Sequence, residues 1–333
     1  MEGRSGLSFA RIALGASFLR DRMASMQKVR TLLKRMLLGP VNYPQTIRLG
    51  LYDPQAKVDV WLHGLDLPIE VTQRHMLASC APLTICIGLQ QEQSERAKSG
   101  RKLALRFHQH AAGQRFLGEI GLRFVSSFSV GTQHLCLFHV THHRNRCLPL
   151  LHLWAHYLQY ARTYEPERNF DVPITLREAR AMIIYFLCPR PVVLVTVVDG
   201  QVGNMFPMNL MGPVGSGYFA FALNSHRSAA PLVHRAGRVV LSSVPLEQAA
   251  VVSKMGANHR KSSIEWNQLP FATITPDAIN APVPAFALTV REMQVIAECQ
   301  LGSHTLFVAK TTAEQHFADS PQFFTAHGLY QAW

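Results

Sequence analysis

The sequence has few acidic residues. Asp and Glu total 21 of 333 residues against 33 Lys and Arg, which gives a formal net charge of +12. Charged residues make up only 16% of the chain and hydrophobic residues 48%, a balance that excludes wholesale disorder and allows a large core or about two domains. The basic excess suits an anionic ligand such as a phosphate ester. Nucleic acid is not expected as a partner, because no aromatic residues alternate with the charges to form a stacking platform.

Long apolar runs, paired cysteines and common nucleotide motifs are also missing. The longest apolar candidate, AMIIYFLCPRPVVLVTVV, is too short for a membrane span because Pro189, Arg190 and Pro191 interrupt it. The six cysteines are scattered without a C-x-x-C pair, so the sequence indicates neither a disulfide framework nor a metal site. Neither G-x-G-x-x-G nor G-x-x-x-x-G-K-[ST] occurs. We therefore expect a soluble, cytoplasmic protein that holds no metal.

Much of the positive charge lies at the start of the chain. Residues 1–38 contain eight basic residues but only Glu2 and Asp21 as acids. A segment of this kind is typical of a targeting peptide or of a basic helix on a phosphate-bearing surface, and Met23, Met26 and Met36 would allow a later start of translation. We treat residues 1–40 as a basic leader that is disordered or not part of the mature protein.

The remaining sequence predicts many short strands and two helices. The stretch QTIRLGLYDPQAKVDVWLHG alternates apolar and polar residues around Asp-Pro and predicts a β-hairpin. Apolar residues at helical spacing predict a helix over 148–164, and Thr175 followed by Glu178 predicts a capped helix over 175–187. Strands then resume to the C-terminus. This order favours small β-barrels over an alternating βαβ sheet.

Two parts of the chain resemble each other. PLTICIGLQQEQSERAKSGRKLALRF (82–107) and GYFAFALNSHRSAAPLVHRAGRVVLSSV (217–244) both predict a strand, a polar loop, a short helix ending in glycine and a second strand. VGTQHLCLFHV (130–140) likewise echoes LGSHTLFVAK (301–310). Duplication therefore predicts a degenerate barrel over 41–147, a helical linker over 148–187 and a second barrel over 188–333, together a covalent pseudo-dimer. Convergence of small-barrel patterns is the alternative explanation.

Four motifs follow one another within residues 188–312: CPRPVVLVTVVDG, the loop GNMFPMNLMGPVGSG, the NSHRSAAPL segment and the closing LGSHTLFVAK. In these motifs and their order the segment resembles the flavin reductase-like family of FMN-binding split barrels. The resemblance implies a mainly β fold with some α-helix, here as tandem split β-barrels, with FMN as cofactor and NADH or NADPH as co-substrate. Flavin and nicotinamide would be the partners, together with a possible homodimer.

The NSHRS segment predicts a phosphate site. Short polar side chains and an arginine fork precede a helix N-terminus, a combination that binds phosphate dianions. The alternative is an ordinary helix cap with a solvated arginine. The resemblance implies that the segment carries the FMN phosphate on Asn224, Ser225, His226, Arg227 and Ser228.

Two further loops complete the implied cofactor site. The MNLM segment would lie along the isoalloxazine ring, although the family usually has Ser or Thr there and these methionines could instead fill the core. The loop MGANHRKSSIEW could add positive charge near the phosphate or bind a phosphate of NAD(P)H, or it could be a solvated basic loop. The implied contacts are Met208, Asn209, Leu210, Met211, His259, Arg260 and Lys261.

His304 opens the last apolar strand, where an imidazole is unexpected. A structural histidine bonded to a carbonyl is one interpretation. The resemblance implies instead that His304 is the catalytic-site residue that faces the flavin pocket and positions the substrate. We expect hydride transfer from NAD(P)H to flavin. The alternatives are a non-enzymatic FMN carrier or sensor, favoured by MNLM, and a reductase-like partner of a monooxygenase.

Overall fold

The computed structural model describes residues 43–331 apart from 53–56, 101, 111–114, 164–171 and 216. The expected leader, residues 1–40, lies outside the described residues. The chain divides into two compact units, one of residues 1–43 and 148–163, the other of 44–147 and 164–333. In the first unit, α3 (Leu150–Thr163) confirms the helix predicted over 148–164, and the ring of Tyr43 packs edge-on against His156 with 5.8 Å between centroids. No described helix is long and apolar enough to cross a membrane.

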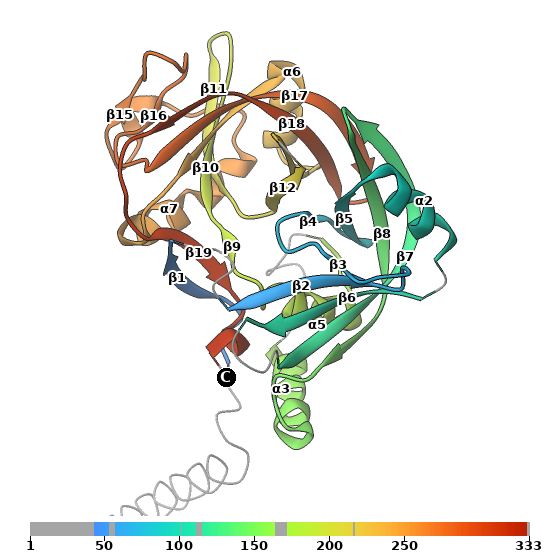
Figure 1. Cartoon of the computed structure of the whole chain (residues 1–333). Coiled ribbons are helices and arrows are strands. Elements are labelled where there is room, and N and C mark those ends of the chain that lie inside the picture. The colour runs from blue at the N-terminus through green and yellow to red at the C-terminus, as the bar shows by residue number, and fades with distance from the viewer. Residues whose placement is uncertain are drawn as a thin grey trace, which may run out of the picture. The chain divides into compact units, whose positions relative to one another are not determined.

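The first half of the second unit is a seven-stranded antiparallel sheet with the order β3-β2-β6-β7-β8-β5-β4 (Figure 1). Strands β2 and β6 alternate buried and half-buried residues, the pattern of a sheet with one face in the core, whereas β4 and β5 are buried along their whole length. Helix α2 (Gln91–Ser99) connects β5 to β6. The strands are β2 (Val58–His63), β3 (Ile69–Glu70), β4 (His75–Cys80), β5 (Leu83–Leu89), β6 (Leu103–Gln109), β7 (Phe116–Val130) and β8 (Gln133–Asn145).

The second half contains another seven-stranded antiparallel sheet, with the order β11-β10-β14-β17-β18-β13-β12. Helix α6 (Ala229–Ala236) connects β13 to β14 and ends at Gly237, whose φ of +62° is the left-handed conformation that favours glycine. The strands are β10 (Val193–Asp199), β11 (Val202–Met208), β12 (Met211–Gly215), β13 (Tyr218–Asn224), β14 (Arg238–Ser243), β17 (Thr289–Leu301) and β18 (His304–His316).

The two sheets have the same strand order when β2 is matched to β10 and each later strand to its counterpart. Neither sheet closes into a hydrogen-bonded barrel within the described residues, so the expected barrels are open sheets. A physical reason is visible at the edges of the second sheet. Pro207 in β11 and Pro213 in β12 have no N–H to donate, so these strands are suited to the sheet edge.

Short elements cover the sheets. Helix α5 (Leu176–Tyr185) has the predicted capping box: the Thr175 hydroxyl accepts from the Glu178 N–H at 3.2 Å, and the Thr175 N–H donates to the Glu178 carboxylate at 2.8 Å. The remaining elements are α7 (Ala249–Lys254), the pair β15 (Thr273–Ile274) and β16 (Val283–Pro284), and 3₁₀ turns at Leu246–Gln248, Met255–Arg260, Trp266–Gln268 and Gly328–Gln331.

The hairpin predicted around Asp53-Pro54 is wrong. Strand β1 (Ile47–Leu51) pairs with β19 (Gln322–Ala326), which also pairs with β9 (Arg190–Pro191). The alternating pattern correctly indicated two strands, but pairing with a strand about 275 residues later is not encoded locally.

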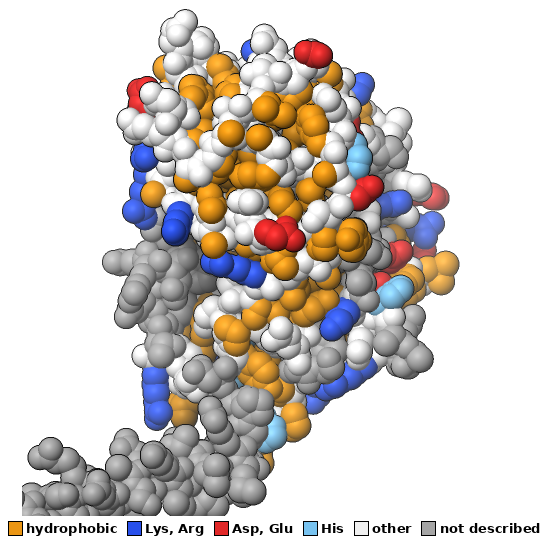
Figure 2. All heavy atoms as spheres, turned by 90° about the vertical axis from the view of Figure 1, so that its left-hand side faces the viewer, with side chains coloured by type: hydrophobic (Ala, Val, Ile, Leu, Met, Phe, Trp, Pro, Cys, Tyr) orange, Lys and Arg blue, Asp and Glu red, His pale blue; other side chains and the backbone are white. Residues whose placement is uncertain are grey.

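Figure 2 shows the face of this unit that carries α7 and β19: hydrophobic side chains gather over its middle, and Lys and Arg lie mostly around its edges.

The two sheets share one core. Met76, Ala78 and Leu135 of the first sheet pack in the same buried cluster as Val214 and Leu306 of the second. The backbones approach closely where β5 crosses β12, because a Cβ atom on Gly88 would lie 1.8 Å from the carbonyl oxygen of Val214. Glycine is required there by contact with backbone that has no room to shift.

Replacing Gly88 with alanine should therefore separate the sheets. We expect Gly88→Ala to lower the free energy of unfolding by about 2–3 kcal/mol or more, because added volume in a packed interior forces backbone movement. Urea denaturation followed by circular dichroism measures this change. Gly256→Ala is the matched control, since a Cβ there meets nothing within 4 Å. Equal stabilities of the two variants would contradict the close approach.

Candidate functional site

A pocket of about 660 Å³ lies where β13 ends and α6 begins. The backbone turns sharply after Asn224, whose side-chain oxygen accepts a hydrogen bond from the His226 N–H at 2.9 Å. The pocket is lined by five of the predicted cofactor-binding residues and by two residues of the linker: Asn224, His226, Arg227, Ser228, Arg260, Val172 and Pro173. The structure therefore gathers positive charge and polar groups at a helix N-terminus, the arrangement that binds anions.

The loop before Lys261 is held against β11 by buried amide contacts. Asn204 donates to the carbonyl oxygens of Asn258 and Lys261 at 2.9 and 2.8 Å, and Asn258 donates to the Met205 carbonyl at 2.9 Å. The Ser228 hydroxyl donates to the Arg260 carbonyl at 3.1 Å, which ties this loop to the start of α6. The loop is therefore positioned by main-chain contacts, while the Arg260 and Lys261 side chains are exposed.

His259 is held in place by a hydrogen bond, so one of its two ring nitrogens is not available to a ligand. Its Nε2–H donates to the Pro207 carbonyl at 2.7 Å, and its ring lies 4.5 Å from the Phe206 ring, centroid to centroid. Burial lowers the pKa of His259 to about 4, with the Pro207 hydrogen bond opposing this shift and the charge of Arg227 adding to it. The imidazole is thus neutral at pH 7 and contributes shape, not charge.

His304 lies beside Asn224 in the β13–β18 register and is only 5% exposed. The Ser303 hydroxyl donates to its Nδ1 at 2.8 Å, and the Cys80 N–H points to the same nitrogen at 3.5 Å. Nδ1 is therefore an acceptor, and the proton of the neutral ring is on Nε2. Burial, followed by the nearby charge of Arg227, lowers the pKa of His304 to about 4.

The first half of the chain helps to hold His304. The Ala81 N–H donates to the Ser303 hydroxyl at 3.0 Å, and the Ser303 N–H donates to the Ala81 carbonyl at 2.8 Å. Ser79 and Cys80 contact the same serine and histidine. These partners were not predicted from the sequence, although the Gly-Ser-His spacing placed Ser303 beside the imidazole.

The remaining predicted site residues do not line this pocket, and they include His259, Lys261 and His304. Met208 and Met211 are buried in the core of the second sheet, and Asn209 donates to the Thr325 hydroxyl at 3.3 Å, while Leu210 is half-buried. The Ser225 hydroxyl contacts Thr305 at 3.0 Å and accepts from Gln300 at 2.8 Å, so it faces the β17–β18 hairpin. The structure therefore does not bring Ser225 or the MNLM segment together with Arg227 at this pocket.

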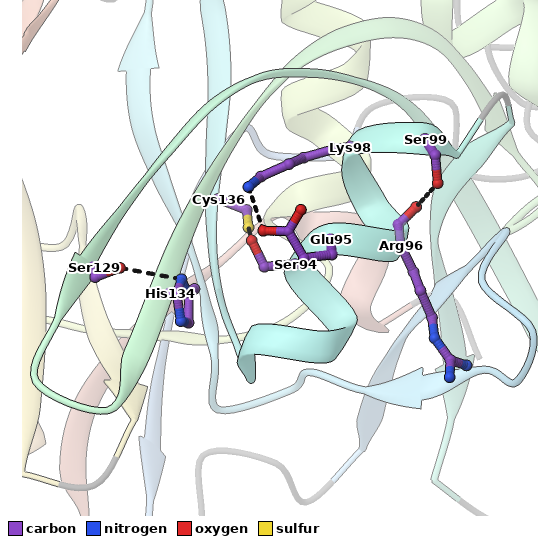
Figure 3. A network of polar contacts seen from close by, with 8 residues as sticks. All are labelled: Ser94, Glu95, Arg96, Lys98, Ser99, Ser129, His134 and Cys136. Carbon is purple, nitrogen blue, oxygen red and sulfur yellow. Dashed lines mark hydrogen bonds and ion pairs between the residues drawn. The ribbon is translucent and has the colours of Figure 1, made fainter.

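A corresponding pocket of about 570 Å³ lies at α2 in the first sheet, but its chemistry is different. Gln90, Gln91, Glu92, Glu95 and Arg96 line it, so two carboxylates replace the histidine and serine of the α6 pocket. Figure 3 shows the surrounding side chains bonded to one another: Lys98 pairs with Glu95 at 2.5 Å, and Ser94 lies 3.1 Å from the Cys136 sulfur. This pocket is poorly suited to an anion.

The histidine of the first sheet is displaced by one residue from the position of His304. Gly131 and Gly302 have the same φ of +57°, so the two turns align on these glycines and Gln133 corresponds to His304. His134 corresponds to Thr305 and bonds across its hairpin to Ser129 at 3.2 Å (Figure 3). Thr305 bonds in the same way to Gln300 at 2.8 Å. The echo read from the sequence identified the turn correctly but paired the wrong residues, because adjacent strand residues face opposite sides.

Residues 185–331 match the model of the Flavin reductase like domain. This match contains the segment 188–312 in which the sequence resembles that family, and it confirms the resemblance. No curated protein matches the chain.

Solved structures with partial similarity include an FMN-binding protein from Thermus thermophilus with bound 1-cyclohex-2-enone (21% identity, 38% of this chain and 71% of that chain, TM-score 0.35). A second is the NADH:FAD oxidoreductase SgcE6 of Streptomyces globisporus C-1027 (14% identity, 45% of this chain and 88% of that chain, TM-score 0.40). A third is BorF, the flavin reductase component of a bacterial two-component tryptophan halogenase (16% identity, 45% of this chain and 92% of that chain, TM-score 0.40).

The buried state of His304 predicts a pH dependence of stability. A histidine with a folded pKa near 4 and an unfolded pKa near 6.5 binds its proton more readily in the unfolded chain, so stability is lost as pH falls from about 6.5 to 4. Within that window each such group contributes a slope of at most about 1.4 kcal/mol per pH unit. We expect His304→Gln to reduce the slope measured by urea denaturation between pH 6.5 and 4.5. His226→Gln, at an exposed position, is the control, and equal slopes in both variants would contradict this assignment.

Proposed function

We propose that the second half of the chain binds FMN, with the phosphate in the α6 pocket, and acts as an oxidoreductase that transfers hydride from NAD(P)H to the flavin. The observation that carries the proposal is the convergence of Arg227, Arg260, Ser228 and a helix N-terminus on one pocket of a flavin reductase like domain. Its volume of about 660 Å³ is in the range of pockets that hold cofactors.

The residues present fit a phosphate ester. The Arg227 and Arg260 guanidinium groups supply positive charge, and Ser228 supplies a hydroxyl at the first turn of α6. A dianion is favoured at this position by the helix dipole and by charge-assisted hydrogen bonds. At the α2 pocket Arg96 is already paired with Asp66 and Glu92, so we assign one flavin to the chain and leave the first half without one.

When bound, a flavin supplies the hydride-accepting chemistry itself, so the protein's part is binding and orientation. We assign His304 the role of positioning the substrate, as a neutral imidazole with its proton on Nε2. Ser303 and the β4–β5 turn fix its orientation, and its lowered pKa keeps it uncharged where a nicotinamide cation is formed. His259, held by the Pro207 carbonyl and packed against Phe206, fixes the loop that carries Arg260.

We further propose that the two halves arose by duplication and form a covalent pseudo-dimer. The shared strand order supports this, and so do reciprocal contacts. A Cβ on Gly302 would meet the Ala81 carbonyl at 2.2 Å, and a Cβ on Gly131 would meet the Tyr218 hydroxyl at 2.3 Å. The hairpin turn of each sheet thus packs near the β4–β5 or β12–β13 turn of the other, as in a two-fold interface. In this account the first sheet is the wall that a second subunit would otherwise supply.

A second candidate is an FMN carrier or sensor without turnover. The burial of Met208 and Met211 and the bond of Asn209 to Thr325 favour it, because this hairpin then presents few side-chain donors to a flavin ring. For either function we place the protein in the cytoplasm, a reducing compartment, because all six cysteines are free thiols.

The phosphate assignment predicts selective loss of FMN binding on removal of one charge. We expect Arg227→Met to weaken FMN binding at least tenfold and to leave riboflavin binding within about twofold, because only FMN carries the phosphate that the charge-assisted bonds would hold. Fluorescence titration of each flavin measures both constants. Arg235→Met on the same helix is the control, since Arg235 pairs with Asp199 at 3.1 Å on the exposed face. Equal loss of both flavins would contradict a phosphate contact.

Anaerobic titration separates the two candidate functions. For a reductase we expect bleaching of the flavin absorption band by NADH or NADPH, and the rate should fall in His304→Ala while FMN affinity is retained. A flavin that dithionite reduces and neither nicotinamide reduces would identify the carrier. Absence of any bound flavin at micromolar concentration would reject both.

A further inference from the structure

We propose that a second cavity, built around the buried side chain of Arg190, binds a small organic monocarboxylate. This cavity of about 260 Å³ lies at the other end of β13 from the α6 pocket: Phe219, near the start of the strand, lines it, whereas Asn224 at the end lines the α6 pocket. Both halves of the chain contribute to it, through His75 and Arg190 among others. The proposal does not depend on flavin binding.

Arg190 has no anionic partner among the residues that the structure describes. Its side chain is 4% exposed, and its Nε is buried without a hydrogen-bond partner. Nη1 donates to the His75 carbonyl at 3.2 Å, Nη2 contacts His75 Nε2, and the guanidinium carbon lies 4.2 Å from the centroid of the Tyr185 ring. None of the described carboxylates forms an ion pair with it.

The titratable groups around Arg190 are neutral. His75 donates from Nδ1 to the Val71 carbonyl at 2.7 Å, and burial together with the charge of Arg190 lowers its pKa well below the usual range. Burial raises the pKa of Tyr185 to about 12 and also raises the pKa of the Cys188 thiol. Asp59, the acid whose field reaches Cys188, already pairs with His110 at 2.8 Å.

The other charge at the cavity is already compensated. Arg291 forms two hydrogen bonds of 2.9 Å with the Glu314 carboxylate. One net positive charge therefore remains, on Arg190. An unpaired buried charge is strongly unfavourable, and a ligand with one negative charge would compensate it. A phosphate dianion would leave excess negative charge near Glu314.

The shape and the walls define the rest of the ligand. The cavity is lined by the apolar side chains of Val193, Met211, Phe219 and Phe324, so the part of the ligand away from its carboxylate should be apolar. A volume of about 260 Å³ accommodates a molecule of the size of benzoate and excludes a nucleotide. Neither arginine of the α6 pocket lines this cavity, and of the predicted flavin contacts only Met211 does. The structure thus assigns it a ligand class different from FMN or NAD(P)H.

Calorimetric titration of the full chain with benzoate tests the proposal, with benzamide as the uncharged analogue of the same shape at constant ionic strength. We expect benzoate to bind at least tenfold more tightly than benzamide and to raise the thermal unfolding midpoint as its concentration increases. Arg190→Met should remove this preference, whereas Arg235→Met should retain it. Addition of 1 mM FMN should leave benzoate affinity unchanged.

A second variant covers the possibility that Arg190→Met does not fold. Ser243 lines the cavity and is buried, so Ser243→Leu fills part of it while retaining Arg190. We expect this variant to fold, by circular dichroism, and to weaken benzoate binding at least tenfold. Equal affinities for benzoate and benzamide, benzoate binding unaffected by Ser243→Leu, or competition by FMN would each overturn the assignment of a separate monocarboxylate site.

Discussion

The contact between the two sheets is the constraint on which the rest of the structure depends. Glycine lets β5 approach the backbone of β12, and the apolar side chains of both sheets fill one buried cluster. The same approach brings the β4–β5 turn against Ser303 and His304, so the imidazole is held by residues from both halves. The candidate site is therefore a property of the whole second unit, although most of its polar groups come from the flavin reductase like domain.

Equivalent positions in the two sheets carry different charge. At α6, Arg227 and Arg260 line the pocket at the helix N-terminus, and the charge of Arg227 adds to burial in lowering the pKa values of the nearby His259 and His304. At α2, Glu92 and Glu95 occupy the corresponding place beside two glutamines, and they pair with Arg96 and Lys98. The two sheets thus share a backbone topology, and the charge of the side chains determines which of the two pockets, at α6 or at α2, can bind an anion.

Local patterns in the sequence predicted the local features of the fold. Helical spacing and the Thr175–Glu178 pair predicted α3 and α5, and the NSHRS segment predicted the polar corner at α6. Long-range features were not predictable in this way: β1 pairs with β19, and Arg190 reaches His75 across 115 residues. Ser225, predicted to bind the phosphate, faces the β17–β18 hairpin and does not line the α6 pocket, and residue type alone does not show to which side a residue of this turn points.

The pairing of β1 with β19 has a consequence for how the unit unfolds. Because the first described strand of the unit is hydrogen-bonded to its last, separating the two halves would leave β1 and one edge of β19 unpaired. Loss of either half therefore removes hydrogen-bond partners from the other, which couples the two halves during unfolding.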